Sequence, residues 1–172
     1  MNNVGYWGLL GCLTLEWLAL GLWVGGMVVL IGAVIPAVFN TFGGQDSGGI
    51  FLTRTFDGYH RFVIGAMAVL CAACVYRWWS GEPAVAVGRG EVMILALMVA
   101  IAGVVILVLH PQAAALQAEA FATQDEAAKK AAFESLFRIL LPIRVLDMVN
   151  LALGVLLIGT KTKRSLRQEG AV

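Results

Sequence analysis

The stretch VMILALMVAIAGVVILVL, residues 92–109, decides the fold of this chain. It contains no charged side chain, and a helix of roughly 20 apolar residues crosses a hydrocarbon layer about 30 Å thick. Three further apolar stretches, residues 17–39, 62–79 and 145–158, are long enough or nearly long enough to do the same. The sequence therefore predicts an all-α protein, a four-helix transmembrane bundle.

The composition of the chain supports the same class. Of its 172 residues, 60% are hydrophobic and 13% are charged, whereas an average soluble domain carries about 25% charged residues. Nearly all of the charges lie between or beside the apolar stretches. A net charge of +1 argues against a nucleic-acid-binding protein. We expect a single domain, residues 1–172, in contact with the lipid bilayer, with spans at about 13–39, 62–79, 92–110 and 140–160.

The segment between the third and fourth apolar stretches has the pattern of a helical hairpin. Residues 112–122 are rich in Ala, Leu, Gln and Glu, which favour helix, and TQDE at 123–126 has the capping-box pattern of a new helix start. Apolar residues then recur at helical spacing, at Phe133, Leu136, Phe137 and Leu140. We expect helices 3 and 4 to extend beyond the membrane as a short antiparallel hairpin, with Pro142 at a bend or at the entry to span 4.

Glycines in the first span predict a helix-packing face. Gly21 and Gly25 are four residues apart, and Gly32 falls two turns beyond on a similar face. Small residues at such spacing let a neighbouring helix approach closely in lipid. Pro36 can kink the last turns of this helix, and the stretch 40–49, rich in Gly and polar residues, predicts a loop.

Basic residues near the span ends predict the orientation of the protein in the membrane. The residues concerned are Arg77 and Arg89, beside the short link between spans 2 and 3, and Lys161, Lys163, Arg164 and Arg167 in the tail. An even number of spans places this link and both termini on one side. We expect that side to be the cytoplasm, which leaves the loop after span 1 and the helical hairpin facing outward.

Three polar residues open the fourth span. Arg144, Asp147 and Asn150 are each three residues apart, so they lie on one side of the helix, with Asn150 about 9 Å deeper than Arg144. A charge near mid-membrane costs at least a few kcal/mol, so these side chains should face the bundle and pair, Arg144 first with Asp147. They form either a polar pocket or an internal salt bridge that fixes the helix register.

The two histidines lie at the ends of apolar stretches. His60 begins span 2 and His110 ends span 3, so both reach the same outer surface. Two imidazoles at one level of a bundle can ligate a haem, copper or zinc ion. Two ligands alone are a weak metal signal, and interfacial histidines also bond water or a backbone carbonyl. We expect no cofactor and no metal site, with haem b or copper on His60 and His110 as the alternative.

Glu16 is an acidic residue early in the first span. On the predicted topology Arg77 and Lys161 lie at its level and can neutralise it, although an intramembrane carboxylate also serves in proton or ion relays. The sequence has no Gly-rich phosphate loop, no Ser/His/Asp arrangement and no polar stripe across several helices. Catalysis therefore has little support, and we expect the protein not to be an enzyme.

Several short motifs resemble a known family. They are LWVGG at 22–26, IPAVF at 35–39, the stretch 49–56 and YHRF at 59–62, followed by Asn150 after a helix start that contains Phe137. In motif order and span count the chain resembles the domain of unknown function 4149, related to the transmembrane-protein-205-like group. The resemblance implies a four-helix bacterial inner-membrane protein without settled chemistry. In that family a His commonly precedes the Asn, whereas this chain has Leu140-Leu141-Pro142 in the corresponding region.

Three functions follow from these patterns. The leading prediction is a non-enzymatic accessory or structural subunit of a larger membrane complex, because the glycine strip and the amphipathic hairpin both offer packing surfaces. One alternative is a haem- or copper-binding membrane protein. The other is a small transporter with a polar pocket at Arg144, Asp147 and Asn150, although broken helices and inverted repeats, common in transporters, are not evident.

Overall fold

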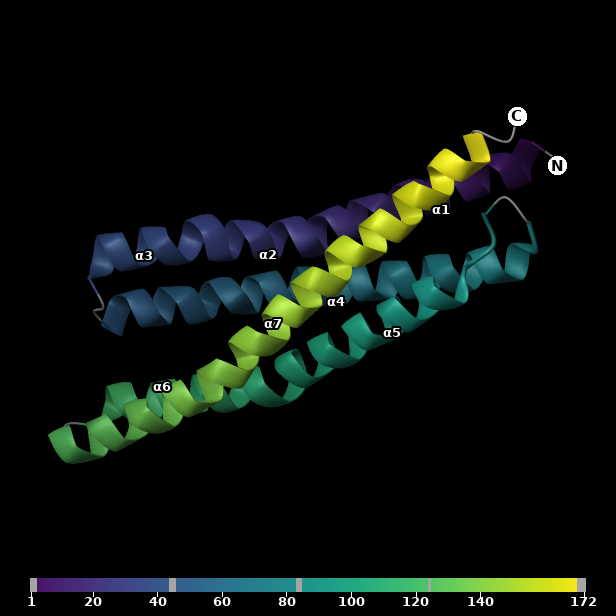
Figure 1. Cartoon of the computed structure of the whole chain (residues 1–172). Helices are drawn as coiled ribbons and strands as arrows, with labels where there is room; N and C mark the ends of the chain where they lie inside the picture. The colour runs from purple at the N-terminus through teal and green to yellow at the C-terminus, as the bar shows by residue number, and fades with distance from the viewer. Residues whose placement is uncertain (1–2, 44–45, 83–84, 124, 170–172) are drawn as a thin grey trace.

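The computed structural model describes residues 3–43, 46–82, 85–123 and 125–169, and these form four long helical rods that run antiparallel (Figure 1). The first rod joins α1 (Asn3–Leu20), η1 (Gly21–Gly25), α2 (Gly26–Val29), η2 (Leu30–Val34) and α3 (Ile35–Phe42). The second is α4 (Asp46–Ser80). The third joins α5 (Arg89–Val104), η4 (Val105–Leu109) and α6 (His110–Ala122), and the fourth is α7 (Glu126–Glu169). No strand occurs in these four ranges, which confirms the predicted all-α class.

Each rod is long and apolar enough to cross a membrane. The candidate spans are Trp7–Phe42, Ser47–Ser80, Arg89–Ala122 and Ala127–Ser165. The 35 residues of α4 and the 44 residues of α7 correspond to about 52 and 66 Å at a rise of about 1.5 Å per residue. Both helices are therefore longer than the hydrocarbon layer.

Two of the wide helical turns precede a proline. The π-helical turn η2 leads into α3, which has Pro36 in its first turn, and η4 leads into α6, which has Pro111 in its first turn. Proline lacks an N–H group and its ring collides with the carbonyl four residues earlier. A wider turn accommodates the missing bond, so each rod continues through its proline. Pro142 likewise lies inside α7 and does not end it.

The loop predicted at residues 40–49 is mostly helix, so that prediction was wrong. α3 continues to Phe42, where Gly43 adopts a left-handed conformation with φ of 58° and ends it. Gly48 and Gly49 lie inside α4. A Cβ added at Gly48 would lie 3.0 Å from Phe42 Cβ, and one at Gly49 would lie 2.9 Å from Gln117 Nε2. These glycines permit close packing between helices instead of marking a turn.

The start of α7 is capped near the predicted place but by a different residue. The Asp125 carboxylate accepts hydrogen bonds from the backbone N–H groups of Ala127 and Ala128, at 3.4 and 3.3 Å. The Thr123 hydroxyl instead donates to the Glu119 carbonyl at the end of α6, at 2.9 Å. Asp125 therefore caps the new helix by accepting from two of its free N–H groups. Its negative charge is also favourable at the positive end of the helix dipole.

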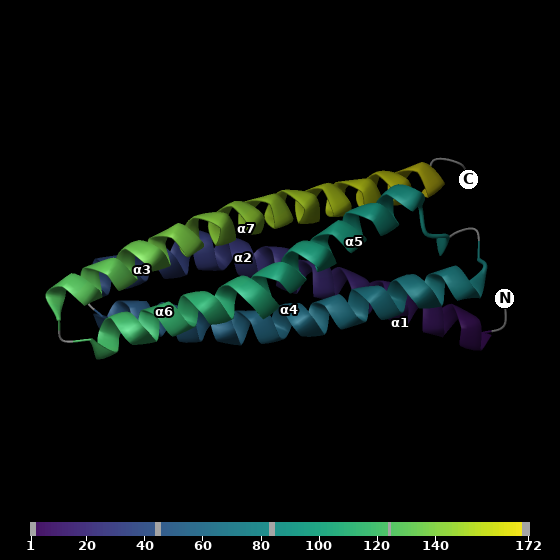
Figure 2. The same ribbon diagram turned by 90° about the horizontal axis from the view of Figure 1, so that it is seen from below.

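The rods pack as two hairpins that meet at one end. α1 packs on α4, α5 and α6 pack on α7, and α7 also contacts η1. Near the middle, one almost fully buried side chain from each rod fills the core: Leu20, Leu70, Met98 and Leu157. Toward the α3 end the α3–α4 pair diverges from the α6–α7 pair (Figure 1). Seen from below, the α6–α7 pair lies in front of the α3–α4 pair (Figure 2). The space between them forms the site described below.

Among the described residues, the predicted glycine packing face contacts no other helix. A Cβ added at Gly21, Gly25 or Gly32 would meet nothing within 4 Å. The close helix approaches occur instead at Gly26, where a Cβ would lie 2.7 Å from the Tyr59 ring, and at Gly154, where it would lie 2.5 Å from Val24 Cγ2. Gly26 follows Gly25 by about 100° around the helix, so the packing face is the adjacent one.

Candidate functional site

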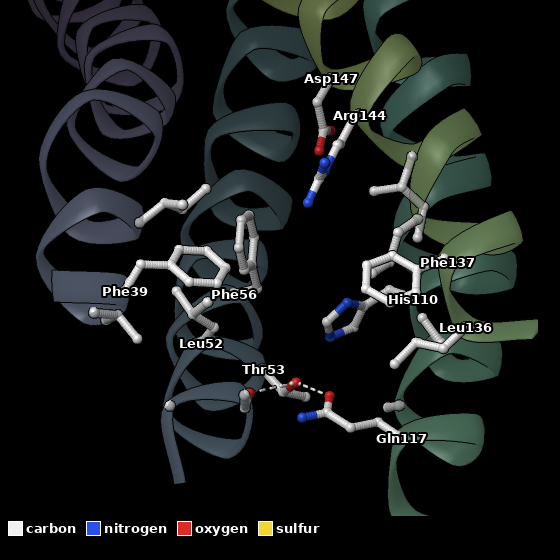
Figure 3. Close-up of a pocket in the computed structure, with 18 of the residues that line it drawn as sticks. Phe39, Leu52, Thr53, Phe56, His110, Gln117, Leu136, Phe137, Arg144 and Asp147 are labelled. Atoms are coloured by element: carbon white, nitrogen blue, oxygen red, sulfur yellow. Dashed lines mark hydrogen bonds between the residues drawn. The ribbon is translucent and has the colours of Figure 1, made fainter. Parts of the chain in front are cut away.

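A cavity of about 620 Å³ lies between the two hairpins where they diverge. Its wall is mainly apolar and combines residues of α3, α4, α6 and α7 (Figure 3). The aromatic residues that line it are Phe39, Phe42, Phe56, Phe121, Phe133 and Phe137. The polar residues that line it are Thr53, His60, His110, Gln117, Arg144 and Asp147. This composition, apolar with a few polar groups, is typical of small-molecule sites.

One side of the cavity is closed by contacts between α4 and α6. The Thr53 hydroxyl hydrogen-bonds Gln117 Oε1, and His110 Nε2 lies 2.7 Å from Asp57 Oδ1. The opposite side, between α3 and α7, has Phe39 and Phe137 at its edges, and they are 53% and 64% exposed. The two rings face each other across the cavity (Figure 3). The cavity therefore opens sideways between α3 and α7.

The structure brings the two histidines together. The ring centres of His60 and His110 are 4.5 Å apart and the rings are almost perpendicular, at 88°. Two histidines that ligate one haem iron from opposite faces have nitrogens roughly 4 Å apart, with ring centres farther out. The spacing found here leaves no room for a porphyrin between the rings. Among the described residues no group of three His, Cys, Asp or Glu side chains is placed to hold a metal ion.

Arg144, Asp147 and Asn150 share one side of α7, as their spacing predicted. Arg144 and Asp147 line the cavity, and Asp147 and Asn150 line an adjoining void of about 10 Å³. The expected ion pair between Arg144 and Asp147 is absent among the described residues. Asn150 is 4% exposed, and its Oδ1 accepts no hydrogen bond from any described residue. Because Arg144 and Asp147 are not paired with each other, both charges are available to a ligand in the cavity.

A buried ion cluster joins all four rods at the opposite end. Arg77 Nη1 lies 2.9 Å from Glu16 Oε1 and 2.6 Å from Glu91 Oε1. Lys161 Nζ lies 2.6 Å from the same oxygen of each carboxylate. Arg77 Nε also donates to the Val85 carbonyl, at 2.9 Å. We call Glu16, Arg77, Glu91 and Lys161 the ion cluster; its two acids and two bases compensate one another's charge.

Comparison with family models identifies the chain. A model of the domain of unknown function DUF4149 matches residues 18–122. The chain belongs to this family. Comparisons with curated proteins and with solved structures found no match. The matched part of this DUF4149 protein contains His60, His110, Arg77 and Glu91, whereas the α7 residues of the cavity lie beyond it.

The ion cluster was predicted in part. Glu16 is paired by Arg77 and Lys161, as expected for residues at one level of the bundle. The role of Glu91 was not predicted, because this residue directly follows the Gly-rich link. Its position could have indicated a pairing with Arg77, because the first turn of span 3 lies at the level of the last turn of span 2.

The cavity itself was not predicted. Its phenylalanines occur in α3, α4, α6 and α7 and form no sequence motif. Phe133 and Phe137 were recognised only as one apolar face of the hairpin. The cavity arises because the two hairpins diverge, a tertiary relationship with no local signal. The apolar character of the hairpin face was the part that could have indicated a buried space.

Proposed function

We propose that this DUF4149 protein is a non-enzymatic membrane protein that binds the apolar part of an amphiphilic molecule in the cavity between its hairpins. The observation that carries the proposal is the cavity of about 620 Å³, lined by six phenylalanines and open between α3 and α7. Small-molecule sites have volumes of about 300–1,000 Å³ and combine apolar walls with a few polar groups. The opening between α3 and α7 gives an amphiphile at the membrane boundary a way into the cavity.

The apolar core between the cavity and the ion cluster supports ligand binding rather than transport across the membrane. Leu20, Leu70, Met98 and Leu157 are at most 1% exposed. On each rod this residue lies between the cavity residues and the ion-cluster residue. The described residues thus form an apolar layer with no polar stripe across it. The transporter alternative would need a path through this layer, so we do not extend the proposal to transport.

The lengths of the rods support a position of the cavity at and beyond the outer membrane boundary. Trp78 and Trp79 are 81% and 85% exposed at the end of α4, and tryptophans favour the membrane–water interface. A layer about 30 Å thick spans roughly 20 helical residues, which leads from Trp78 back to about Gly58. On this placement the α6–α7 hairpin projects out of the hydrocarbon layer, the extension that its sequence predicts, and the first turns of α4 project with it.

We further propose the orientation and location that the sequence indicated, a bacterial inner membrane with both termini in the cytoplasm. Six of the twelve Lys and Arg residues belong to each end of the bundle. The proposal rests on how closely the basic residues cluster at one end, because four of them fall within residues 161–167, directly after the last apolar stretch. A reporter fused after residue 172 should be active in the cytoplasm, and activity outside would reverse the orientation.

The binding proposal can be tested by filling the cavity. Ala114 lines the cavity on α6, whereas Ala118 is exposed one turn later and does not line it. Monoolein, an uncharged single-chain amphiphile, serves as the probe, and native mass spectrometry in detergent measures its binding. Ala114→Phe should weaken monoolein binding, and Ala118→Phe should leave it unchanged. Equal binding by both variants and the unaltered protein would refute the proposal.

An accessory role in a larger complex is the second candidate. Among the described residues, the glycine strip at Gly21, Gly25 and Gly32 has no neighbour within 4 Å of an added Cβ, so it remains available to a helix of another membrane protein. Replacing Gly25 with Leu should release a companion that otherwise co-purifies in mild detergent. Gly103, which also has open space beside it, provides the matched control as Gly103→Leu. Isolation of a free monomer in every case would contradict this role.

A further inference from the structure

Three hydrogen-bond acceptors converge on the small void beside the cavity. The void of about 10 Å³ is lined by His60, Asp147 and Asn150. His60 and Asn150 are 7% and 4% exposed, and within the described part of the chain His60 Nδ1 and Asn150 Oδ1 have no hydrogen-bond partner. Buried polar atoms without partners cost free energy, so such a pair calls for a group that satisfies both. Asp147 adds a carboxylate that no described cation pairs.

A primary ammonium matches these acceptors. It carries three N–H donors and a positive charge, and the three groups around the void are a carboxylate, an amide oxygen and a ring nitrogen that accepts in one neutral tautomer. A void of about 10 Å³ holds one group about as large as a water molecule. A water could donate to only two of the acceptors and would leave the Asp147 charge uncompensated.

A phosphate matches the remaining charge. Arg144 lines the same cavity one turn before Asp147 and is directed into it (Figure 3). No acidic side chain of the described residues forms an ion pair with it, and guanidinium groups bind phosphate through two parallel hydrogen bonds. One end of the cavity therefore presents an unpaired cation next to an unpaired anion. The complementary ligand carries a negative and a positive group a short distance apart.

We propose that the cavity binds phosphatidylethanolamine, with its ammonium in the void among His60, Asp147 and Asn150 and its phosphate at Arg144. The acyl chains then lie along the phenylalanines, in the part of the cavity at and beyond the proposed membrane boundary. This inference rests on the proposed function, since it names the amphiphile that the cavity holds. It also gives a chemical reason for two buried polar atoms that the bundle leaves without partners.

Lipid headgroups separate this proposal from related ones. Phosphatidylcholine has the same two charges, but its quaternary ammonium has no N–H donor. Phosphatidylglycerol keeps the phosphate and lacks the cation. Hydrogen bonds to charged groups contribute enough free energy that phosphatidylethanolamine should bind at least about tenfold more tightly than either lipid. The lipids carry the same two oleoyl chains, and native mass spectrometry of the full chain in detergent measures each dissociation constant.

Variants of α7 assign the two parts of the headgroup. Asp147→Asn should abolish the preference for phosphatidylethanolamine over phosphatidylcholine and leave monoolein binding unchanged. Arg144→Gln should weaken phosphatidylethanolamine and phosphatidylglycerol alike, because both carry the phosphate. Glu134→Gln and Arg138→Gln change exposed charges on the same helix that do not line the cavity. Both controls should bind every lipid as the unaltered protein does.

The outcomes separate the two proposals. Equal affinity of the unaltered protein for phosphatidylethanolamine and phosphatidylcholine overturns the headgroup assignment even if a variant fails to fold. Glycerophosphoethanolamine, which has the headgroup without chains, should not compete, and full competition would show a soluble ligand instead of a lipid. If monoolein binds normally but headgroups are not distinguished, the proposed function stands alone. If neither monoolein nor any phospholipid binds, both proposals fall.

Discussion

Arg77 Nη1 lies 2.9 Å from Glu16 Oε1, and both side chains are only 4% exposed. The pair joins α1 to α4, and Glu91 and Lys161 extend it to α5 and α7. Removing one partner of a buried ion pair strands the other charge away from water, which costs more than the pair itself contributed. The ion cluster is therefore the place where a single substitution should weaken all four rods together.

Replacing Arg77 with Met should lower the free energy of unfolding by about 3–5 kcal/mol, because Glu16 and Glu91 lose their shared guanidinium. Unfolding in mixed micelles with increasing dodecyl sulfate, followed by circular dichroism, measures the change. Arg89 is exposed at the same end of the bundle, so Arg89→Met should shift the free energy by less than about 0.5 kcal/mol. The double variant with Glu16→Met should recover part of the loss, and simple additivity would show that the two residues are not coupled.

Leu157 and Leu156 are adjacent in α7 but differ in surroundings. Leu157 is 1% exposed in the core between the hairpins, and Leu156 is 57% exposed. Leu157→Ala should cost about 2–5 kcal/mol, since it removes packing and leaves a cavity. Leu156→Ala should cost much less by the same unfolding measurement. Similar losses at both positions would mean that the rotation of α7 described here is wrong.

Gly154 and Gly159 provide a second matched pair on α7. A Cβ at Gly154 would lie 2.5 Å from Val24 Cγ2, whereas one at Gly159 would meet nothing within 4 Å. Gly154→Ala should therefore destabilise the bundle by about 1–3 kcal/mol through overpacking. Gly159→Ala should stabilise it by up to about 1 kcal/mol, because alanine favours helix. Thermal unfolding in detergent gives both values, and the opposite signs are the diagnostic result.

The Tyr59 hydroxyl donates a buried hydrogen bond to the Trp23 carbonyl, at 2.6 Å. This bond lies where the first rod has the wide turn η1, and it ties that turn to α4. Tyr59→Phe should lower the free energy of unfolding by about 0.5–1.5 kcal/mol. Tyr76 is 42% exposed and makes no hydrogen bond among the described residues, so Tyr76→Phe should have a smaller effect. An equal loss at both positions would argue against the bond.

The fold was predictable because each apolar stretch carries its own signal. A run such as residues 92–109 is explained only by a long helix in an apolar environment. The helix ends were less predictable, since glycines have two uses. Gly43 ends α3, whereas Gly48 and Gly49 lie inside α4 where a side chain would collide. Composition alone does not distinguish a glycine that permits a turn from one that permits close packing.

The level of the site residues along the helices was predictable, but the direction in which their side chains point was not. His60 and His110 occur at matching helix ends, and the structure places their rings in contact. The sequence also placed Arg144 and Asp147 on one side of α7, but it could not show that they remain unpaired. Rotation and tilt of each helix are set by packing against its neighbours. The Tyr59 ring against Gly26 is one contact that fixes such a rotation.

The position of the ion cluster has a mechanical consequence. The ion cluster holds all four rods together at one end, whereas at the other end the contacts of Thr53 with Gln117 and of His110 with Asp57 join the two pairs through α4 and α6 and leave α3 and α7 apart. Among the described residues, no hydrogen bond or ion pair fixes the distance between α3 and α7, which border the opening of the cavity. A tilt of α3 or α7 that is too small to break an ion pair still changes the width of this opening. Ligands of different width can therefore be accommodated while the ion cluster stays intact.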